Sequence, residues 1–271
     1  MRTIDRRDAE YPESLLRLGD PPDRLYVRGV LSLAPAVAVV GSRRCTRYGA
    51  ALARTIARSV VSAGWTVVSG LARGIDTASH LGALDGRGRT VAVLGCGIDT
   101  WYPASNRQLG ERILESGAVV SEYGPGVEPA PWRFPARNRI IVGLAGAVVV
   151  AEAAERSGAL ITARIAMEHG IDVYAVPGDL DRETSRGTNR LIADGAHPVI
   201  APGELIEALE RSIGPAAPCE PRPEVPLDGP MFVHEVAAAM GVTIGEASKR
   251  IGEWELAGLV RLASGMVEPV M

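Results

Sequence analysis

Short apolar runs alternate with glycine-bearing turns and helical stretches from residue 37 onward. The runs are rich in valine and alanine and cover residues 37–40, 65–68, 90–94, 118–121, 147–151, 172–176 and 197–201. Apolar β-branched runs that are followed by helical patterns are typical of a parallel sheet covered on both faces. With right-handed crossovers, this order predicts an α/β fold, a Rossmann-like doubly wound and mostly parallel sheet over residues 37–214.

The flanking segments differ from this repeating pattern. Residues 1–36 precede the first run, and we expect them to form a lead-in extension. Residues 215–226 contain five prolines and predict a stiff, extended linker. Beyond the linker, two helical stretches separated by Gly241 and a final hairpin pattern predict a small winged-helix-like domain over 227–271.

Loops that combine glycine, hydroxyl and arginine side chains follow three of the runs. They cover residues 40–44, 69–76 and 152–162. Ligands of open α/β sheets bind at the carboxyl ends of the strands, where these loops are expected to lie. Glycines let a ligand approach the backbone, and the amides at a helix N-terminus bind anions, so the loops are candidate phosphate sites. The same residues also suit tight strand-to-helix turns with solvated arginines, and both interpretations stay open here.

Aromatic and arginine side chains mix in the segment 132–141. The whole chain has 12 aromatic residues, and two of them, Trp132 and Phe134, lie here among three arginines. Aromatic rings stack bases and arginines hold phosphates, which is the combination that single-strand binders use. The alternative is that the rings anchor the core and the arginines form salt bridges. A polar segment, 185–189, follows a later strand and is expected to close over the same crevice.

These patterns together predict a site for single-stranded DNA. Its predicted residues are Gly41, Ser42, Arg43, Ser69, Gly70, Arg73, Gly74, Phe134, Arg137, Asn138, Arg139, Ser157, Gly158, Thr162, Thr188 and Asn189.

Charge restricts the form of such a site. The net charge is −3, residues 37–214 carry +1, and residues 227–271 carry −3. No segment is a general polycation, so any nucleic-acid site must be a local cluster of arginines. Of the 29 basic residues 28 are arginines, whose planar fork donates two hydrogen bonds to a phosphate at once.

Several functional classes lack their usual sequence signals. No uncharged apolar window of about 18 residues is present, so we expect no membrane span. Three widely spaced cysteines and a charged N-terminus suggest a cytoplasmic protein with reduced thiols. The four histidines have no metal-ligand spacing, and there is neither a Walker A lysine nor a nucleophile elbow. We therefore expect no catalytic residues, no metal and no cofactor.

The motifs, taken in order, resemble those of the DNA-processing protein A (DprA/Smf) family. The resemblance covers roughly residues 11–212 and rests on Gly41-Ser42-Arg43, Ser69 to Asp76, Gly95 to Asp99, Tyr102-Pro103, Phe134 to Ile141, Ser157 to Leu160 and Gly187-Thr188-Asn189. It implies a homodimeric, ATP-independent protein that binds single-stranded DNA and loads a RecA-type recombinase during natural transformation. Arg43 and Phe134 to Arg139 fall where that family holds DNA.

The chain departs from the family pattern in two ways, and two rival functions remain. Many members carry a helical domain before the lead-in, for which 36 residues leave no room, and many use lysines in their DNA groove. One rival is a nucleoside-monophosphate phosphoribohydrolase of the same superfamily, although residues 152–162 lack its Pro-Gly-Gly-x-Gly-Thr motif. The other is a sensor that binds a small nucleotide in the same loops.

Overall fold

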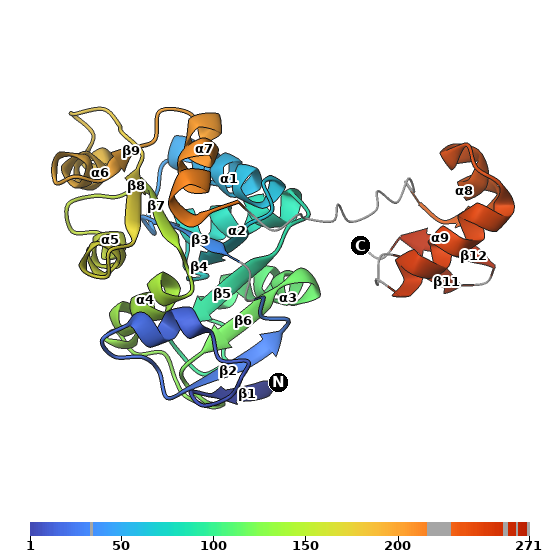
Figure 1. The fold of residues 1–271 in the computed structure, drawn as a ribbon, viewed down its shortest axis with the longest axis horizontal. Coiled ribbons are helices and arrows are strands. Elements are labelled where there is room, and N and C mark those ends of the chain that lie inside the picture. Colours follow the sequence, from blue (N-terminus) through green and yellow to red (C-terminus); the bar gives the residue numbers. More distant parts are fainter. Residues whose placement is uncertain (33–34, 216–228, 257–259, 264, 270–271) are drawn as a thin grey trace. The chain divides into compact units, whose positions relative to one another are not determined.

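The computed structural model describes residues 1–32, 35–215, 229–256, 260–263 and 265–269. The chain divides into two compact units, Met1–Cys219 and Glu220–Met271, which are described separately (Figure 1). Apart from Pro215, the linker predicted from the prolines lies outside the described residues.

A nine-stranded sheet forms the centre of the first unit, in the order β1-β2-β6-β5-β4-β3-β7-β8-β9. The predicted apolar runs all form strands of its parallel part, which confirms the predicted α/β, Rossmann-like class. These strands are β3 (Ala36–Gly41), β4 (Thr66–Ser69), β5 (Thr90–Leu94), β6 (Ala118–Ser121), β7 (Ala147–Glu152), β8 (Asp172–Ala175) and β9 (His197–Pro198). The last strand is shorter than its apolar run.

The N-terminal residues join this sheet. β1 (Arg2–Asp5) pairs antiparallel with β2 (Arg24–Gly29), and β2 pairs antiparallel with β6. Between them a 3-10 helix, η1 (Glu13–Arg17), places Leu15 in the core. The expected lead-in extension is thus part of the edge of the sheet. The sequence pattern did not show this, because antiparallel strands need no helical crossover between them.

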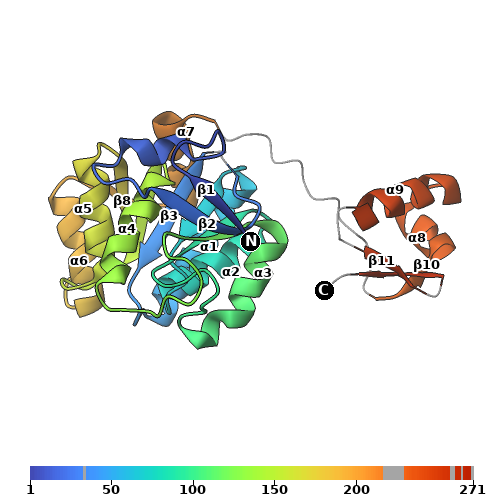
Figure 2. The same cartoon turned by 90° about the horizontal axis from the view of Figure 1, so that it is seen from below.

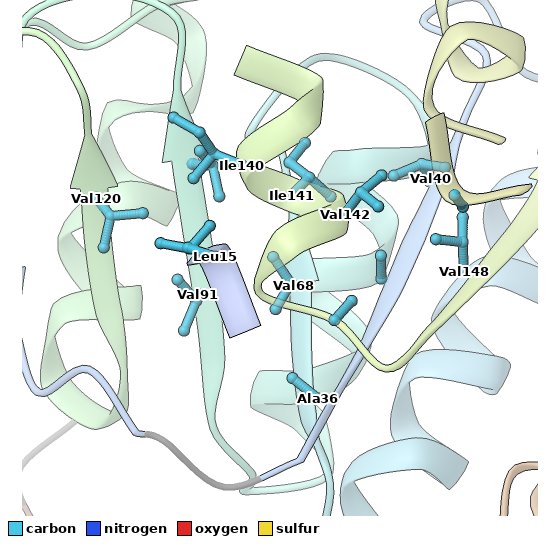
Figure 3. Packing of buried hydrophobic residues seen from close by; sticks show 14 of the residues in the cluster. Leu15, Ala36, Val40, Val68, Val91, Val120, Ile140, Ile141, Val142 and Val148 are labelled. Carbon is cyan, nitrogen blue, oxygen red and sulfur yellow. The ribbon is translucent and has the colours of Figure 1, made fainter. Parts of the chain in front are cut away.

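Helices cover both faces of the sheet. Along β3, Val37 and Val39 face α1 and α7, whereas Ala38 and Val40 face α4 and α5, as the two-residue period of a strand requires. Figure 3 shows Ile140, Ile141 and Val142 of α4 lying across strands that carry Val120, Val91, Val68 and Val148. The helices of this unit are α1 (Arg47–Ser62), α2 (Ile75–Asp85), η2 (Ala104–Asn106), α3 (Arg107–Ser116), α4 (Arg133–Gly143), α5 (Gly158–Glu168), α6 (Glu183–Ala193) and α7 (Pro202–Ile213) (Figure 2).

The chain changes direction across the sheet between β3 and β7. From β3 it continues through β4 and β5 to one side, and from β7 through β8 and β9 to the other. Crevices at such switch points, beyond the carboxyl ends of the strands, are where open α/β sheets bind ligands. The sheet order therefore places the predicted loops 40–44 and 152–162, which follow β3 and β7, beside each other.

The second unit has its own small core. Its elements are β10 (Met231–Phe232), α8 (Val233–Met240), α9 (Ile244–Leu256), β11 (Val260–Ala263) and β12 (Met266–Pro269). Gly241 turns the chain between the helices at a φ of 64°, and the strands form a sheet in the order β10-β12-β11. Val236, Ile251 and Trp254 are buried between helices and sheet. Two helices followed by a hairpin agree with the order of elements read from the sequence.

Helices α1 and α2 pack unusually closely because of a glycine. A Cβ atom at Gly82 of α2 would overlap the carbonyl oxygen and the Cα of Arg54 in α1. Glycine lowers helix propensity relative to alanine, so its place in the middle of α2 is explained by this backbone contact.

We expect Gly82→Ala to lower the free energy of unfolding by about 1–3 kcal/mol, because the added methyl group forces the two helices apart. Gly203→Ala is the matched control, since a Cβ there meets no atom within 4 Å and the residue also lies in a helix. Denaturant titration of both variants checks this expectation. Equal stability of the two variants would contradict the close packing.

Candidate nucleic-acid interface

A groove of about 1090 Å³ opens at the carboxyl ends of the strands. The loops after β3, β4, β5 and β7 and the first turns of α4, α5 and α6 form its walls. Its lining residues are Val40, Gly41, Ser42, Arg43, Arg44, Ala72, Asp76, Tyr102, Pro131, Phe134, Pro135, Arg137, Asn138, Ile141, Ala154, Glu155, Arg156, Ser157, Gly158, Ala159, Ile161, Thr162, Glu183, Thr184 and Arg186.

The groove brings together predicted residues from three separate motifs. They are Gly41, Ser42, Arg43, Phe134, Arg137, Asn138, Ser157, Gly158 and Thr162. Segments about 100 residues apart in the chain thus share one surface, because the parallel strands that precede them end at one edge of the sheet.

Phe134 lies in a stack of protein groups. The centres of the Tyr102 and Phe134 rings are 5.1 Å apart with their planes inclined by 30°, and the Arg43 guanidinium carbon lies 5.1 Å from the centre of the Phe134 ring. A Cβ atom at Gly95 would also meet the Phe134 ring, so that glycine lets the ring settle on the backbone. Phe134 thus positions Arg43 and Tyr102, and the Tyr102 side chain is 44% exposed.

Trp132 does not anchor the core, because its side chain is 71% exposed. It lies just before α4, and the Arg133 guanidinium lies 5.9 Å from its ring centre and 5.0 Å from that of Tyr123. The core interpretation of the two aromatic residues therefore fails for Trp132.

Four exposed arginines line the groove: Arg43, Arg44, Arg156 and Arg186. Within the described parts of the chain, none of the four has an acidic partner within 4.0 Å. Of these four, only Arg43 is among the residues predicted from the sequence. The others are direct neighbours of predicted residues or lie in predicted segments, so their positions beside glycine and serine were the available signal.

Arg137 lies beneath the groove and is only 4% exposed. Its Nη1 donates to the carbonyl oxygens of Gly70, at 2.6 Å, and of Val93. Burial lowers its pKa, while the charge of the buried Asp76 acts in the opposite direction. Burial likewise raises the pKa of Asp76, against the attraction of Arg137. Arg137 therefore joins α4 to the ends of β4 and β5 instead of presenting a free fork to a phosphate.

The expectation that α1 offers its N-terminus to an anion is corrected by Glu152. This buried carboxylate at the end of β7 accepts hydrogen bonds from the backbone N–H of Thr46, at 2.9 Å, and from its hydroxyl. The Thr46 Oγ1 in turn accepts from the N–H of Gly49. Because Ser42 to Thr46 form a loop before the helix begins at Arg47, the protein's own carboxylate occupies the end of α1.

The N-terminus of α5 faces the groove. Ser157 caps this helix by accepting from the N–H of Ala159 at 3.3 Å. Gly158 is exposed, and a Cβ atom there would meet nothing within 4 Å, so a ligand can approach the backbone. The first turn of α5 contains no acidic residue, which leaves the positive end of its dipole available to an anion.

Three predicted residues support the groove from behind. The buried hydroxyl of Ser69 donates to the carbonyl of Val39 at 2.8 Å. A Cβ atom at Gly70 would overlap the Arg137 guanidinium, so this glycine makes room for that group. Gly74 has a φ of 78°, and a Cβ there would overlap the carbonyl of Ser42. These three residues therefore shape the loops and do not line the groove.

The remaining predicted residues also lie outside the groove lining. Arg139 forms ion pairs with Glu122, at 2.6 Å, and with Asp20, at 3.4 Å. The Thr188 hydroxyl is buried and donates to the carbonyl of Ser185, while the Asn189 amide binds both backbone groups of Gly178. Arg73 is exposed but is not among the lining residues.

No group of three or more histidine, cysteine, aspartate or glutamate side chains among the described residues could hold a metal ion. In the same parts of the chain, no helix combines the length and apolar character needed to cross a bilayer.

The family described as DNA recombination-mediator protein A matches residues 2–210. The chain belongs to this family. It is 45% identical over 202 residues to DNA processing protein DprA of Streptococcus pneumoniae, covering 74% of this chain and 71% of the relative. Protein Smf of Escherichia coli is 38% identical over 275 residues, 94% of this chain and 74% of the relative.

Solved structures of the DNA processing protein A family share the fold. The Streptococcus pneumoniae protein superposes with a TM-score of 0.72 at 43% identity, over 76% of this chain and 73% of that one. The Helicobacter pylori protein, described for its single-stranded DNA binding mode, gives 0.71 at 31% identity, over 78% and 95%. A molybdenum cofactor binding protein of Rippkaea orientalis, at 18% identity and a TM-score of 0.50 over 66% and 98%, shares the fold alone.

In this member of the DNA recombination-mediator protein A family, His80 is part of the core. Its Nδ1 lies 2.7 Å from the Thr90 hydroxyl, which itself donates to the carbonyl of Val67. Nδ1 must therefore carry the proton, and the buried Nε2 has no partner among the described residues. Burial, aided by the charge of Arg137, lowers the pKa of His80 from 6.5 to about 3. A neutral imidazole enclosed in this way has no access to a substrate.

We expect His80 to make the stability fall in acid. Below pH 6.5 His80 binds a proton in the unfolded chain, whereas in the folded chain it stays neutral down to about pH 3. The free energy of unfolding therefore drops by up to about 1.4 kcal/mol per pH unit across this window. In His80→Asn, whose amide still reaches Thr90, the decline between pH 6.5 and 5 is shallower by about that slope. Urea titrations at several pH values measure it, and parallel pH profiles would refute the assignment.

Proposed function

We propose that this chain is a recombination mediator that binds single-stranded DNA along the groove. The observation that carries the proposal is the cluster of Arg43, Arg44, Arg156 and Arg186, four exposed arginines without acidic partners within the described residues, beside the ring of Tyr102. Arginine forks bind phosphates in pairs of hydrogen bonds, and an exposed ring offers a face for a base.

The distribution of ion pairs supports a phosphate-binding role for this cluster. Elsewhere in the first unit, arginines such as Arg54, Arg107 and Arg190 have a carboxylate within 3.1 Å. At the groove the same side-chain type stands without one, so its charge is available to a ligand. Arginines without an acidic partner also lie elsewhere in the described first unit, Arg112 of α3 among them, and the groove differs in gathering four of them on one surface.

Exposed rings favour a single strand over a duplex. Tyr102 and Trp132 stand at or next to the groove with much of their surface exposed. A ring can stack only on a base whose face is free, and in duplex DNA the faces are covered by neighbouring pairs. The shared fold with the Helicobacter pylori protein, described for binding single-stranded DNA, points to the same ligand.

The remaining parts of the proposal rest on family membership. We propose that the chain acts in the cytoplasm as a homodimer and loads a RecA-type recombinase onto the bound strand. We also propose that it works by binding and not by catalysis. The rival phosphoribohydrolases use a catalytic glutamate, and Glu152, at the corresponding strand end, is buried with its carboxylate hydrogen-bonded to Thr46. Incubation with nucleoside monophosphates should release no free base, whereas a phosphoribohydrolase would produce it.

Titration with a labelled oligonucleotide, single-stranded or annealed to its complement, tests the proposed function. We expect tighter binding of the single strand and little dependence on its sequence, because stacking and phosphate contacts do not read base edges. Equal affinity for blunt duplex and single strand would refute the single-strand proposal.

Titration of the Arg43→Ala variant with the same single-stranded oligonucleotide tests whether the strand binds at the groove. Loss of one phosphate contact should weaken binding at low salt and reduce the slope of log affinity against log salt by about 0.7, the value for one phosphate of a single strand. Arg112→Ala is the control, because this exposed arginine lies on α3 and outside the groove lining. Melting temperatures are measured alongside, since Arg43 also stacks on Phe134. Weaker binding that merely follows a loss of folded protein would mark Arg43 as structural.

Removal of the second unit is expected to leave most of the single-strand affinity in place. Residues 227–271 carry a net charge of −3, and an acidic module repels a phosphate backbone. In α9 the Glu246 carboxylate already accepts from the N–H and the hydroxyl of Thr243, which keeps an acid at the start of the helix that a duplex reader would present to DNA. A chain ending at Gly214 tests this by the same titration. A folded truncation that loses most of its affinity would contradict the expectation.

A further inference from the structure

The exposed face of α1 carries a row of arginines that begins at the rim of the groove. Arg47, Arg54 and Arg58 are all exposed. At 100° per residue they lie within about 20° of one direction around the helix and span about 16 Å along its axis. Arg44, three residues before the row, lines the groove itself. The row therefore leads away from the groove over the outer surface of the first unit.

Charge on this helix is not balanced within the helix itself. The 16 residues of α1 include no aspartate or glutamate. Its only ion pair among the described residues joins Arg54 to Asp85 of α2, whereas Arg107 of α3 and Arg190 of α6 each pair with an acid four residues later in the chain. Arg47 also stands at the positive end of the helix dipole, where a cation is unfavourable. These arginines are therefore poorly explained by the stability of the helix.

An exposed aromatic ring lies on the other edge of the exposed face of α1. Tyr48 is 63% exposed and follows Arg47 in the first turn, about 100° around the helix from the row, where it lines a neighbouring pocket with Thr46 and Glu152. The small residues Ala51 and Thr55 are exposed on the same side and leave the surface between the larger side chains low. Arginines beside an accessible ring are the combination that binds single strands without reading sequence.

We propose that a single strand leaving the groove continues along the exposed face of α1. Arg47 and Arg58 hold its phosphates, Arg54 adds charge between them, and Tyr48 stacks a base next to the groove. This inference rests on the proposed function and extends the binding site from the groove to a second surface. It predicts a length dependence that a groove-only site lacks, because only a longer strand reaches α1.

The test compares two lengths of oligothymidylate, of about 6 and about 20 nucleotides, with the full chain and with Arg47→Gln/Arg58→Gln. Arg54 is left in place because it pairs with Asp85. The double variant should bind the short strand as the unaltered chain does and bind the long strand more weakly. Its salt slope for the long strand should fall by about 1.4, the value for two phosphate contacts of a single strand.

Two further variants separate stacking from bulk charge. Tyr48→Ala should weaken binding of the long strand by about tenfold with an unchanged salt slope, because a stacked ring releases no counterions. Arg17→Gln/Arg112→Gln removes the same two charges from exposed sites on η1 and α3 and should change neither affinity.

The outcomes distinguish this inference from the proposed function. If the unaltered chain binds neither strand, the proposed function fails and this inference with it. If the unaltered chain binds both, and the α1 variants bind the long strand equally well, the α1 path alone is overturned. An equal loss for both lengths, or the same loss in the Arg17 and Arg112 control, would also overturn it, since the effect would then come from net charge.

Discussion

Arg137 reaches from α4 beneath the groove to the carbonyl oxygens of Gly70 and Val93, at the ends of β4 and β5. A buried guanidinium without partners would be strongly destabilising, so these contacts fix the distance between the helix and the strand ends. The glycine at position 70 provides the room that the group needs, and the buried Asp76 provides an opposite charge nearby. The positions of the loops that line the groove depend on these contacts of Arg137.

The arginines of the first unit divide by their surroundings into two kinds. Arg137 and Arg139 lie in the same helix turn, yet one is buried against carbonyl groups and the other is paired with Glu122 and Asp20. Arg43 and Arg156, in loops after β3 and β7, remain without acidic partners in the described structure and face the groove. Arg137 and Arg139 of α4 are thus committed to protein partners, whereas the arginines of the loops after β3 and β7 are available at the groove.

A second division concerns the helix N-termini at the same edge of the sheet. Glu152 closes the start of α1, so the seat that a nucleotide phosphate would take in many Rossmann-like proteins is filled by a side chain. The start of α5 has no acidic residue in its first turn, and its Gly158 is exposed. The N-terminus of α5, and not that of α1, is therefore open to an anion at this edge of the sheet.

The sequence by itself determined the sheet and the edge that carries the site. Runs such as 37–40 and 147–151 can be read as buried parallel strands because their composition reflects burial on both faces, and the glycine loops after them follow from the geometry of the turns. Only the tertiary structure decided which of the predicted side chains are free. Arg137, Arg139 and Arg43 have the same chemistry in the sequence, and the burial and partners that separate them come from segments about 20 to 120 residues away. The antiparallel strands β1 and β2 escaped prediction for the same reason, since the pairing of β2 with β6, which attaches both strands to the sheet, is a long-range contact without a local signature.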